Sequence, residues 1–235
     1  MNSSRLISNG VKASIVIRAY NAEKTLARCV RSALAQRGGD EYEVVIVNDG
    51  SEDGTAQVIR EFSTDPRVRA VEQENRGLIG ASNAGFAAAR GDIVMLLDAD
   101  DEALPDFVAL SCGALTDPSV DYGYGRYYEE YEGVRKLIRP TDPFKAPVGA
   151  FAWRRGKLMA EGGFENGSIF PEYEIVLRTW GRWRGVPIRQ PLFVYHRSRS
   201  SMTGDSELVQ KSIDILRKKY PERAVEIAAI RSYEL

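Results

Sequence analysis

The sequence predicts an α/β fold in which helices flank a mostly parallel sheet, and three observations carry this prediction. Over about residues 12–116, short apolar runs alternate with amphipathic stretches, as in strands that alternate with helices. The apolar runs are nearly continuous, which is typical of parallel strands covered on both faces. Each of the polar motifs "RAYN", "NDGS" and "DADD" directly follows such a run. Ligands of open parallel sheets bind beyond the carboxyl ends of the strands, so these motifs are expected to share one site.

The elements of this first half follow from their patterns. The expected strands are the apolar runs at 13–18, 42–47, 67–72 and 92–97. A helix is expected at 22–36, because Leu26, Val30, Ala33 and Leu34 fall on one helical face. Further helices are expected around Val58 to Phe62, over the Ala-rich stretch 81–90, and from Pro105 to about Leu115.

The second half predicts a smaller, antiparallel portion. The Tyr-rich stretch 120–138 alternates polar and apolar residues and is expected to form a hairpin that turns near Gly133. A loop at 141–147, helices at 154–160 and 172–183, and a strand at 191–198 are expected to follow. A charged helical tail is predicted over 205–231.

Length and composition limit the classes of protein to which the chain can belong. At 235 residues the chain suits a single domain, and its two cysteines, Cys29 and Cys112, have neither metal-site nor redox spacing. "MNSSRLISNG" lacks the apolar core of a signal peptide, and no uncharged stretch is long enough to span a bilayer. The arginines form no known nucleic-acid-binding motif.

Charge is unevenly distributed along the chain. Residues 1–120 carry 12 basic and 18 acidic side chains, whereas residues 121–235 carry 20 basic and 15 acidic ones. The basic second half suits an anionic acceptor or peripheral contact with a membrane, although an ordinary mixed surface is the simpler interpretation.

The acidic run from Asp98 to Glu102 has three interpretations. One or two carboxylates could hold Mg²⁺ or Mn²⁺ and bridge it to phosphate oxygens. The run could instead be a solvated cluster at the start of a helix. An aspartate could also accept a phosphoryl group, but Glu102 stands where that pattern usually has Thr or Val.

Four stretches occur in a familiar order: "SIVIRAYN" (14–21), "VVIVNDGSEDGT" (44–55), "NRGLIGASNAGFAAARGDIVMLLDADD" (75–101) and "GGFENGSIFPEYEIVLRTWG" (162–181). Together they resemble the family 2 glycosyltransferases, which are inverting enzymes with the GT-A nucleotide-sugar-binding fold. The resemblance extends from about residue 12 to residue 203. It implies a nucleotide-sugar-binding half at about 12–116 and an acceptor and catalytic half at about 117–204, followed by the tail at 205–235.

The resemblance implies roles for residues that contact the nucleotide. Tyr20, between Ala19 and Asn21, matches the aromatic residue that packs on the base, and Asp49 matches the acceptor for the base N–H, which suits a uracil. A half-buried tyrosine and a turn aspartate are the simpler alternatives. Arg18 departs from the Pro or Thr that the family often has at this position.

The resemblance also implies a metal and phosphate site. Asp98, Ala99 and Asp100 match the family's Asp-any-Asp motif, with Asp100 as the better ligand for Mn²⁺ or Mg²⁺ and Asp98 at the ribose or the metal's water shell. His196 lies near the position that contacts the metal or diphosphate, and Arg197 and Arg199 could bind diphosphate oxygens. Asn83 is included among the residues expected to bind the nucleotide sugar.

The catalytic base is expected at the start of the helix after the "GGF" turn, where the family has a Glu-Asp pair. Here Pro171 and Glu172 occupy those positions, so Glu172 is the candidate base and Glu174 the second choice. The alternative is that Glu172 only stabilises a helix N-terminus. Trp153, Trp180 and Trp183 could stack on sugars, although the last two have the spacing of core residues.

With these residues, the resemblance implies an inverting, metal-dependent glycosyltransferase that moves a sugar from a nucleotide sugar, expected to be UDP-linked, to a hydroxyl acceptor. The acceptor would be a carbohydrate or a lipid-linked glycan in bacterial-type polysaccharide synthesis. By analogy with the family, a cytoplasmic location is expected, at the inner face of the membrane. Two alternatives remain: a sugar-phosphate nucleotidyltransferase, and a non-catalytic module that binds nucleotide sugars.

Overall fold

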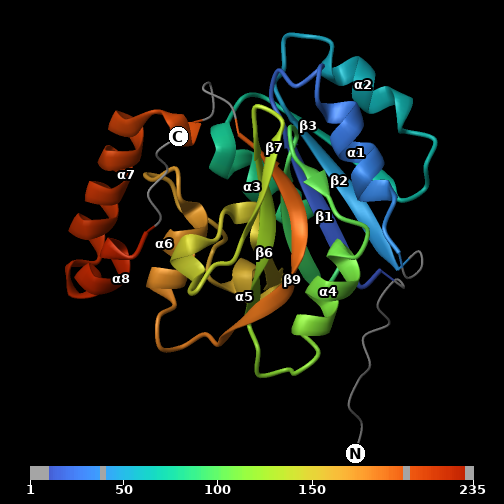
Figure 1. The fold of residues 1–235 in the computed structure, drawn as a ribbon. Coiled ribbons are helices and arrows are strands. Elements are labelled where there is room, and N and C mark those ends of the chain that lie inside the picture. Colours follow the sequence, from blue (N-terminus) through green and yellow to red (C-terminus); the bar gives the residue numbers. More distant parts are fainter. Residues whose placement is uncertain (1–10, 38–40, 198–201, 231–235) are drawn as a thin grey trace, which may run out of the picture.

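The computed structural model describes residues 11–37, 41–197 and 202–230. Within these residues, nine strands form one strongly curled sheet with helices on both sides (Figure 1). The sheet order is β3-β2-β1-β4-β8-β6-β9-β5, with β7 paired to the outside of β6.

The parallel part of the sheet comes from the first half, as predicted. It consists of β1 (Ala13–Ala19), β2 (Tyr42–Asp49), β3 (Val68–Gln73) and β4 (Ile93–Asp98). Every residue of β1 and β2 is buried, because helices cover both faces of these strands. In register, Val16 lies between Val45 and Leu96, and therefore β1, β2 and β4 end at the same edge.

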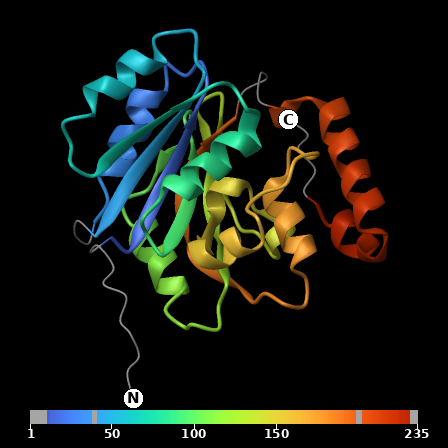
Figure 2. The same cartoon turned by 180° about the vertical axis from the view of Figure 1, so that it is seen from behind.

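Four helices connect these strands and lead into the second half. They are α1 (Leu26–Leu34), α2 (Thr55–Glu61), α3 (Gly77–Ala88) and α4 (Phe107–Ala114). In Figure 2, seen from behind, α3 lies across the face of the sheet opposite to α1 and α2. Gly85 allows α3 to lie this close, because a Cβ at that position would collide with Val16.

The second half extends the sheet with mixed pairing. β8 (Phe151–Arg154) is antiparallel to β4 and to β6 (Tyr122–Tyr131), whereas β6 runs parallel to β9 (Gly185–His196). The two-residue β5 (Glu102–Ala103) pairs with β9. The predicted antiparallel portion is therefore present. Only the β6–β9 pair departs from it: β9 begins at Gly185, well before the predicted 191, and runs parallel to β6.

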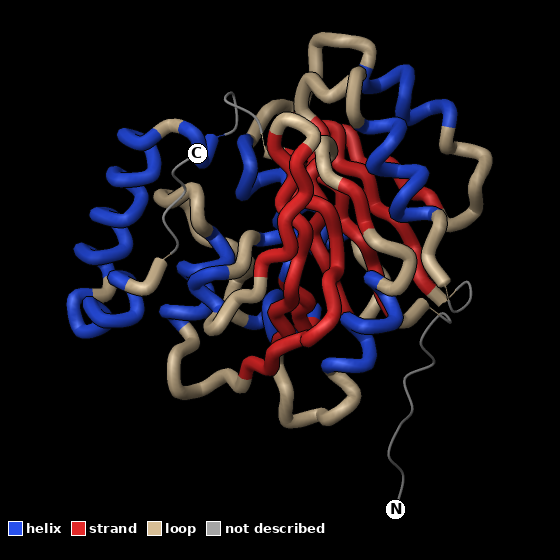
Figure 3. Tube along the Cα trace, in the orientation of Figure 1, coloured by secondary structure: helices blue, strands red, loops and turns tan. Residues whose placement is uncertain are grey.

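The predicted hairpin is present. β6 and β7 (Val134–Ile138) are joined by a tight turn, in which Glu132 and Gly133 have positive φ of 50° and 78°. Among the described strands, β7 pairs only with β6; Figure 3 shows the strands of the sheet in red.

The remaining helices cluster at one side of the sheet. They are α5 (Arg155–Ala160), α6 (Pro171–Arg178), α7 (Ser206–Lys219) and α8 (Ala224–Ala228). Single 3₁₀ turns occur at Pro143–Lys145, Val148–Ala150, Met202–Gly204 and Pro221–Arg223. α6 ends at Arg178, so the helix predicted to reach 183 is shorter, and Gly181 follows with a φ of 77°.

The predicted helical tail is folded back onto the molecule. Leu216 of α7 and Ile227 of α8 are fully buried or nearly so, and α7 stands beside α6 (Figure 1). In the described ranges, no helix is long and apolar enough to cross a bilayer.

Candidate active site

The carboxyl ends of β1, β2 and β4 open into a cleft of about 810 Å³. Its second wall comes from the 3₁₀ turn at Val148, from the start of α6 and from the end of β9. A cleft of this size is in the range of small-molecule sites. The predicted site residues that line it are Ala19, Tyr20, Asn21, Asp49, Asp98, Ala99, Asp100, Glu172, His196 and Arg197.

The acidic run meets a cation from its own chain. Arg18, near the end of β1, forms an ion pair with Asp98 at the end of β4. The Arg18 guanidinium also donates to Ser82 Oγ at 3.2 Å, and only 5% of its side chain is exposed. Sequence reasoning missed this pairing, although a lone arginine in the apolar run "SIVIRA" was the available signal.

Asp100 and Asp101 differ in their surroundings. The described contacts give the Asp100 carboxylate no side-chain donor, and it faces the cleft. Enclosure by the protein, followed by the charge of Asp98, raises the pKa of Asp100. Asp101 is buried and accepts a hydrogen bond from His196 N at 2.9 Å, so it fixes β9 beneath the cleft. Burial and the two neighbouring aspartates hold its pKa well above the usual range.

His196 lines the cleft but is occupied by two glutamates. Its Nε2 lies 2.8 Å from Glu102 Oε1, and its Nδ1 lies 3.4 Å from Glu130 Oε1. Both ring nitrogens thus face carboxylates, and the histidine joins β5, β6 and β9. The assignment of His196 to the metal stays a prediction.

The two residues that the resemblance assigns to the base, Tyr20 and Asp49, differ in exposure. Tyr20 lines the cleft and is 51% exposed, next to Asn21, whose φ is 49°. Asp49 is buried and accepts at Oδ1 from Gln73 Nε2 at 2.6 Å and from Arg76 N at 2.8 Å. Both bonds go to the same oxygen, which leaves acceptor capacity on Asp49.

Asn83 requires a correction, because it lies outside the cleft lining. Its Nδ2 donates to Phe164 O at 2.8 Å, and its Oδ1 accepts from Phe164 N at 2.9 Å. The neighbouring Gly163 has a φ of 75°, and a Cβ there would meet the Asn83 side chain. Asn83 therefore joins α3 to the "GGF" turn and is not assigned to the nucleotide sugar.

Glu172 lies in the first turn of α6, after Pro171 at the first helical position. Only 4% of it is exposed, and Oε2 is buried without a hydrogen-bond partner in the described structure. Burial raises its pKa to about 8, against the smaller opposing effects of a hydrogen bond from its own backbone and of the charge of Arg18. Orphaned, strongly perturbed carboxyls of this kind concentrate at functional sites.

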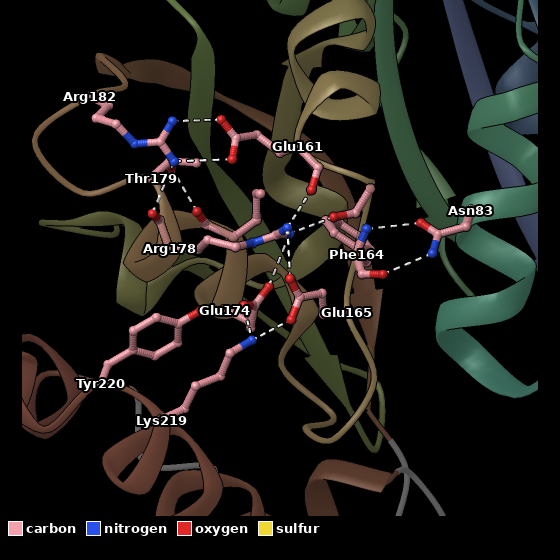
Figure 4. A network of polar contacts seen from close by, with 12 residues as sticks. Asn83, Glu161, Phe164, Glu165, Glu174, Arg178, Thr179, Arg182, Lys219 and Tyr220 are labelled. Carbon is pink, nitrogen blue, oxygen red and sulfur yellow. Dashed lines mark hydrogen bonds and ion pairs between the residues drawn. The ribbon is translucent and has the colours of Figure 1, made fainter.

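Glu174, the second choice of base, does not line the cleft. It belongs to a network on the far side of α6, together with Arg178, Lys219 and Tyr220 (Figure 4). Arg197 is largely buried and lies 3.6 Å from Glu129, and Arg199 lies outside the described residues. The three tryptophans pack with other aromatic rings, Trp153 on Phe151 and Trp180 on Phe144, and not in the cleft.

Comparison with known proteins decides the family. Residues 14–168 match the family model "Glycosyl transferase family 2". The chain belongs to this family. The match confirms the resemblance found in the sequence, and it ends just before α6, the helix that carries Glu172.

Two curated relatives align with only part of their length to this glycosyltransferase. It is 35% identical over 126 residues to "Glycosyltransferase GlyA" of Streptococcus pneumoniae, covering 52% of this chain and 18% of that protein. It is 45% identical over 98 residues to "Chondroitin synthase" of Escherichia coli, covering 41% of this chain and 14% of that protein. The chain thus spans less than a fifth of either relative.

Solved structures confirm the GT-A fold. Staphylococcus aureus TarS 1–349 in complex with UDP-GlcNAc superimposes with a TM-score of 0.71 at 16% identity, covering 88% of this chain and 65% of that one. The mannosyltransferase PcManGT of Pyrobaculum calidifontis, in complex with GDP-Man and Mn²⁺, gives 0.73 at 19% identity, covering 93% and 68%.

Proposed function

We propose that this family 2 glycosyltransferase transfers a sugar, with inversion, from a UDP-linked donor to a hydroxyl of a glycan acceptor. The observation that carries the proposal is Glu172, a buried carboxyl in the same cleft as Asp98 and Asp100, with one oxygen that has no hydrogen-bond partner in the described part of the chain. The family membership and the polysaccharide synthase among the relatives support a role in polysaccharide synthesis.

In this reaction Glu172 accepts the proton of the acceptor hydroxyl. The freed oxygen forms a bond to the anomeric carbon from the side opposite the diphosphate, and the bond from that carbon to the diphosphate oxygen breaks. A diphosphate is stable as an anion, so the departing oxygen needs no protonation and one base suffices. A base with a pKa near 8 is a stronger proton acceptor than an ordinary glutamate once it is ionised.

The protein ligands in the cleft are too few to hold a divalent cation unless the nucleotide sugar is bound as well. Asp100 offers carboxylate oxygens to the cleft, whereas Asp98 is engaged by Arg18. Within the described ranges, no group of three His, Cys, Asp or Glu side chains could hold a metal. We therefore assign Mg²⁺ or Mn²⁺ to Asp100, with Asp98 in support and with water and donor phosphate as the remaining ligands. When bound, the cation would neutralise charge on the leaving diphosphate.

Recognition of the donor is assigned to the first half of the chain. Tyr20 would stack on the uracil ring, and Asp49 would accept a hydrogen bond from its imide N–H. The complexes of TarS with UDP-GlcNAc and of PcManGT with GDP-Man support a nucleotide sugar as the donor class. Residues 12–116 would then form the donor half and 117–204 the acceptor half of the single domain.

We propose that the acceptor binds at the wall of the cleft formed by Val148, Gly149, Ile169 and Phe170. We propose a carbohydrate or lipid-linked glycan acceptor, reached from the cytoplasmic face of the membrane. Recovery of the protein in washed membranes, and its release at high salt, would test the membrane contact.

A nucleotide-release assay tests the function. UDP- and GDP-linked sugars are supplied with a panel of glycan acceptors, with and without a chelator, to the wild type and to Glu172→Gln. We expect acceptor-dependent release of UDP that the chelator and Glu172→Gln both abolish, while UDP binding by Glu172→Gln persists. UDP binding without release from any donor would favour the non-catalytic module. Pyrophosphate release from a nucleoside triphosphate and a sugar phosphate would favour the nucleotidyltransferase.

A further inference from the structure

We propose that the C-terminal helix α7 completes the active site, with Lys219 and Tyr220 acting as positioning residues for Glu172. The inference rests on the proposed function, in which Glu172 is the base. It concerns a segment that begins well beyond the family match at 14–168.

The geometry of α6 separates its two glutamates. At 3.6 residues per turn, two positions along a helix correspond to a rotation of about 200° around its axis, so the two side chains lie on nearly opposite faces. Glu172 faces the cleft, and Glu174 therefore lies on the opposite side of the helix, toward α7 (Figure 4). Any displacement of Glu174 moves the turn of helix that carries Glu172.

Glu174 is a buried carboxylate that depends on α7 for its partners. Only 4% of its side chain is exposed, and Lys219 Nζ and Tyr220 Oη lie 2.8 and 2.5 Å from its Oε1. Arg178, one turn further along α6, lies 3.3 Å from Oε2. Burying a charge without enough partners costs free energy. The position of α6 in which Glu174 contacts Lys219 is therefore the most stable one.

The same cations hold the turn that precedes α6. Arg178 donates to Glu161 O at 2.5 Å and to Gly163 O at 2.6 Å, and lies 3.0 Å from Glu165. Lys219 bridges Glu165 and Glu174, at 2.5 and 2.8 Å. Since Arg178 already serves four oxygens, it cannot replace Lys219 at Glu174 without leaving another partner.

A second contact connects α7 to the cleft wall. Ser212 Oγ, buried on α7, accepts a hydrogen bond from Ile169 N at 3.2 Å, and Ile169 lines the cleft. α7 therefore contacts the segment 169–174 on both sides of Glu172. In Figures 1 and 2, α7 stands outside α6, away from the sheet. Apolar contacts alone could hold α7 there, so packing does not require that a lysine of α7 pair with the buried Glu174.

The test compares Lys219→Met with Lys219→Arg, which keeps the charge, and with Lys218→Met, a neighbouring exposed lysine of the same helix as the matched control. In the nucleotide-release assay, Lys219→Met should lower kcat by about tenfold or more, since misplacing a catalytic group by about 1 Å can cost about a hundredfold. The KM for the donor and the affinity for UDP should change less than about twofold, since the donor contacts remain in place. Lys219→Arg should recover most of kcat, and Lys218→Met should match the wild type. Tyr220→Phe, which removes one hydrogen bond, provides a milder variant that should fold if Lys219→Met does not.

Amide hydrogen exchange gives a readout that does not need activity. Peptides covering 169–178 should exchange faster in Lys219→Met than in Lys218→Met, while α3 peptides should be unchanged. Unchanged exchange at 169–178, or a wild-type kcat in Lys219→Met, would overturn the inference. So would parallel losses of kcat and UDP affinity, which would assign the network to general stability. Failure of the wild type to release nucleotide from any donor would count instead against the proposed function.

Discussion

At the scale of single residues, two features characterise the cleft: the pairing of Arg18 with Asp98, and the buried Glu172, whose Oε2 has no hydrogen-bond partner among the described residues. Arg18 is a buried cation that forms an ion pair with Asp98, and it opposes the rise in the pKa of Glu172, Asp100 and Asp101. Its planar, always charged guanidinium can bond Asp98 and Ser82 at once, which the ammonium group of a lysine does less well.

Replacement of Arg18 should therefore disturb both Asp98 and the base. In Arg18→Gln we expect kcat/KM to fall by about tenfold or more, because Asp98 loses its charged partner. The acid limb of the pH profile should move to higher pH, since the cation that lowers the pKa of Glu172 is gone. Arg18→Lys should restore part of the activity, whereas Arg60→Gln on α2 should have no effect. An unchanged pH profile in Arg18→Gln would contradict this electrostatic role.

The wild-type pH profile is a separate prediction about Glu172. With a pKa of about 8 in the donor-free protein, its carboxyl is mostly protonated at neutral pH and cannot act as a base. We expect kcat/KM to rise with pH and to level off above about pH 8. Initial rates at fixed metal and subsaturating donor would reveal this limb. A profile that is already flat from about pH 6 would show that the base is another group.

At the scale of elements, α6 and the turn before it are joined to separate parts of the molecule. Asn83 ties the turn to α3, Arg178 ties it to α6, and Lys219 ties both to α7 (Figure 4). Because the first contact is made to the backbone of Phe164, its loss would leave a donor and an acceptor without protein partners.

Asn83→Ala tests whether this residue is structural. We expect a loss of about 1–3 kcal/mol in the free energy of unfolding, with UDP affinity and donor KM unchanged in the folded protein. Asn83→Asp should be intermediate, because it keeps the acceptor for Phe164 N but loses the donor. A large loss of UDP affinity at full stability would instead support assignment of Asn83 to the nucleotide sugar.

At the scale of the whole molecule, acids whose pKa rises on folding make the folded state less stable in alkaline solution. Burial raises the pKa values of Glu172 and Asp101, and partial desolvation in the cleft together with the charge of Asp98 raises that of Asp100. A folded pKa above the unfolded one contributes stability that is complete below the unfolded pKa and is lost as the pH rises through the folded value.

The melting temperature of the donor-free protein should therefore decrease as the pH is raised from about 5 to about 9. Burial raises the pKa of Glu172 from the ordinary glutamate value of 4.5 to about 8, and each tenfold change in proton affinity is worth about 1.4 kcal/mol. Glu172→Gln should remove a large part of the slope and melt above the wild type at about pH 9, as measured by scanning calorimetry. A wild-type slope of the opposite sign would mean that Glu172 is ionised and solvated in the folded protein.

The sequence alone determined the elements and the family. Period and composition located the four parallel strands, because buried parallel strands are continuously apolar, and they located the hairpin at Gly133, because its turn requires positive φ. The motifs "RAYN", "NDGS" and "DADD" were placed correctly at one cleft, since parallel strands end at a common edge.

Only the tertiary structure decided which side chains meet. The pairing of Arg18 with Asp98, of His196 with two glutamates, and of Asn83 with the backbone of Phe164 joins residues far apart in the chain. The opposite environments of Glu172 and Glu174, and the folding of α7 onto α6, likewise depend on packing. Local pattern fixes the face of a helix on which a residue lies, whereas its partner is set by the way distant elements fill the space around it.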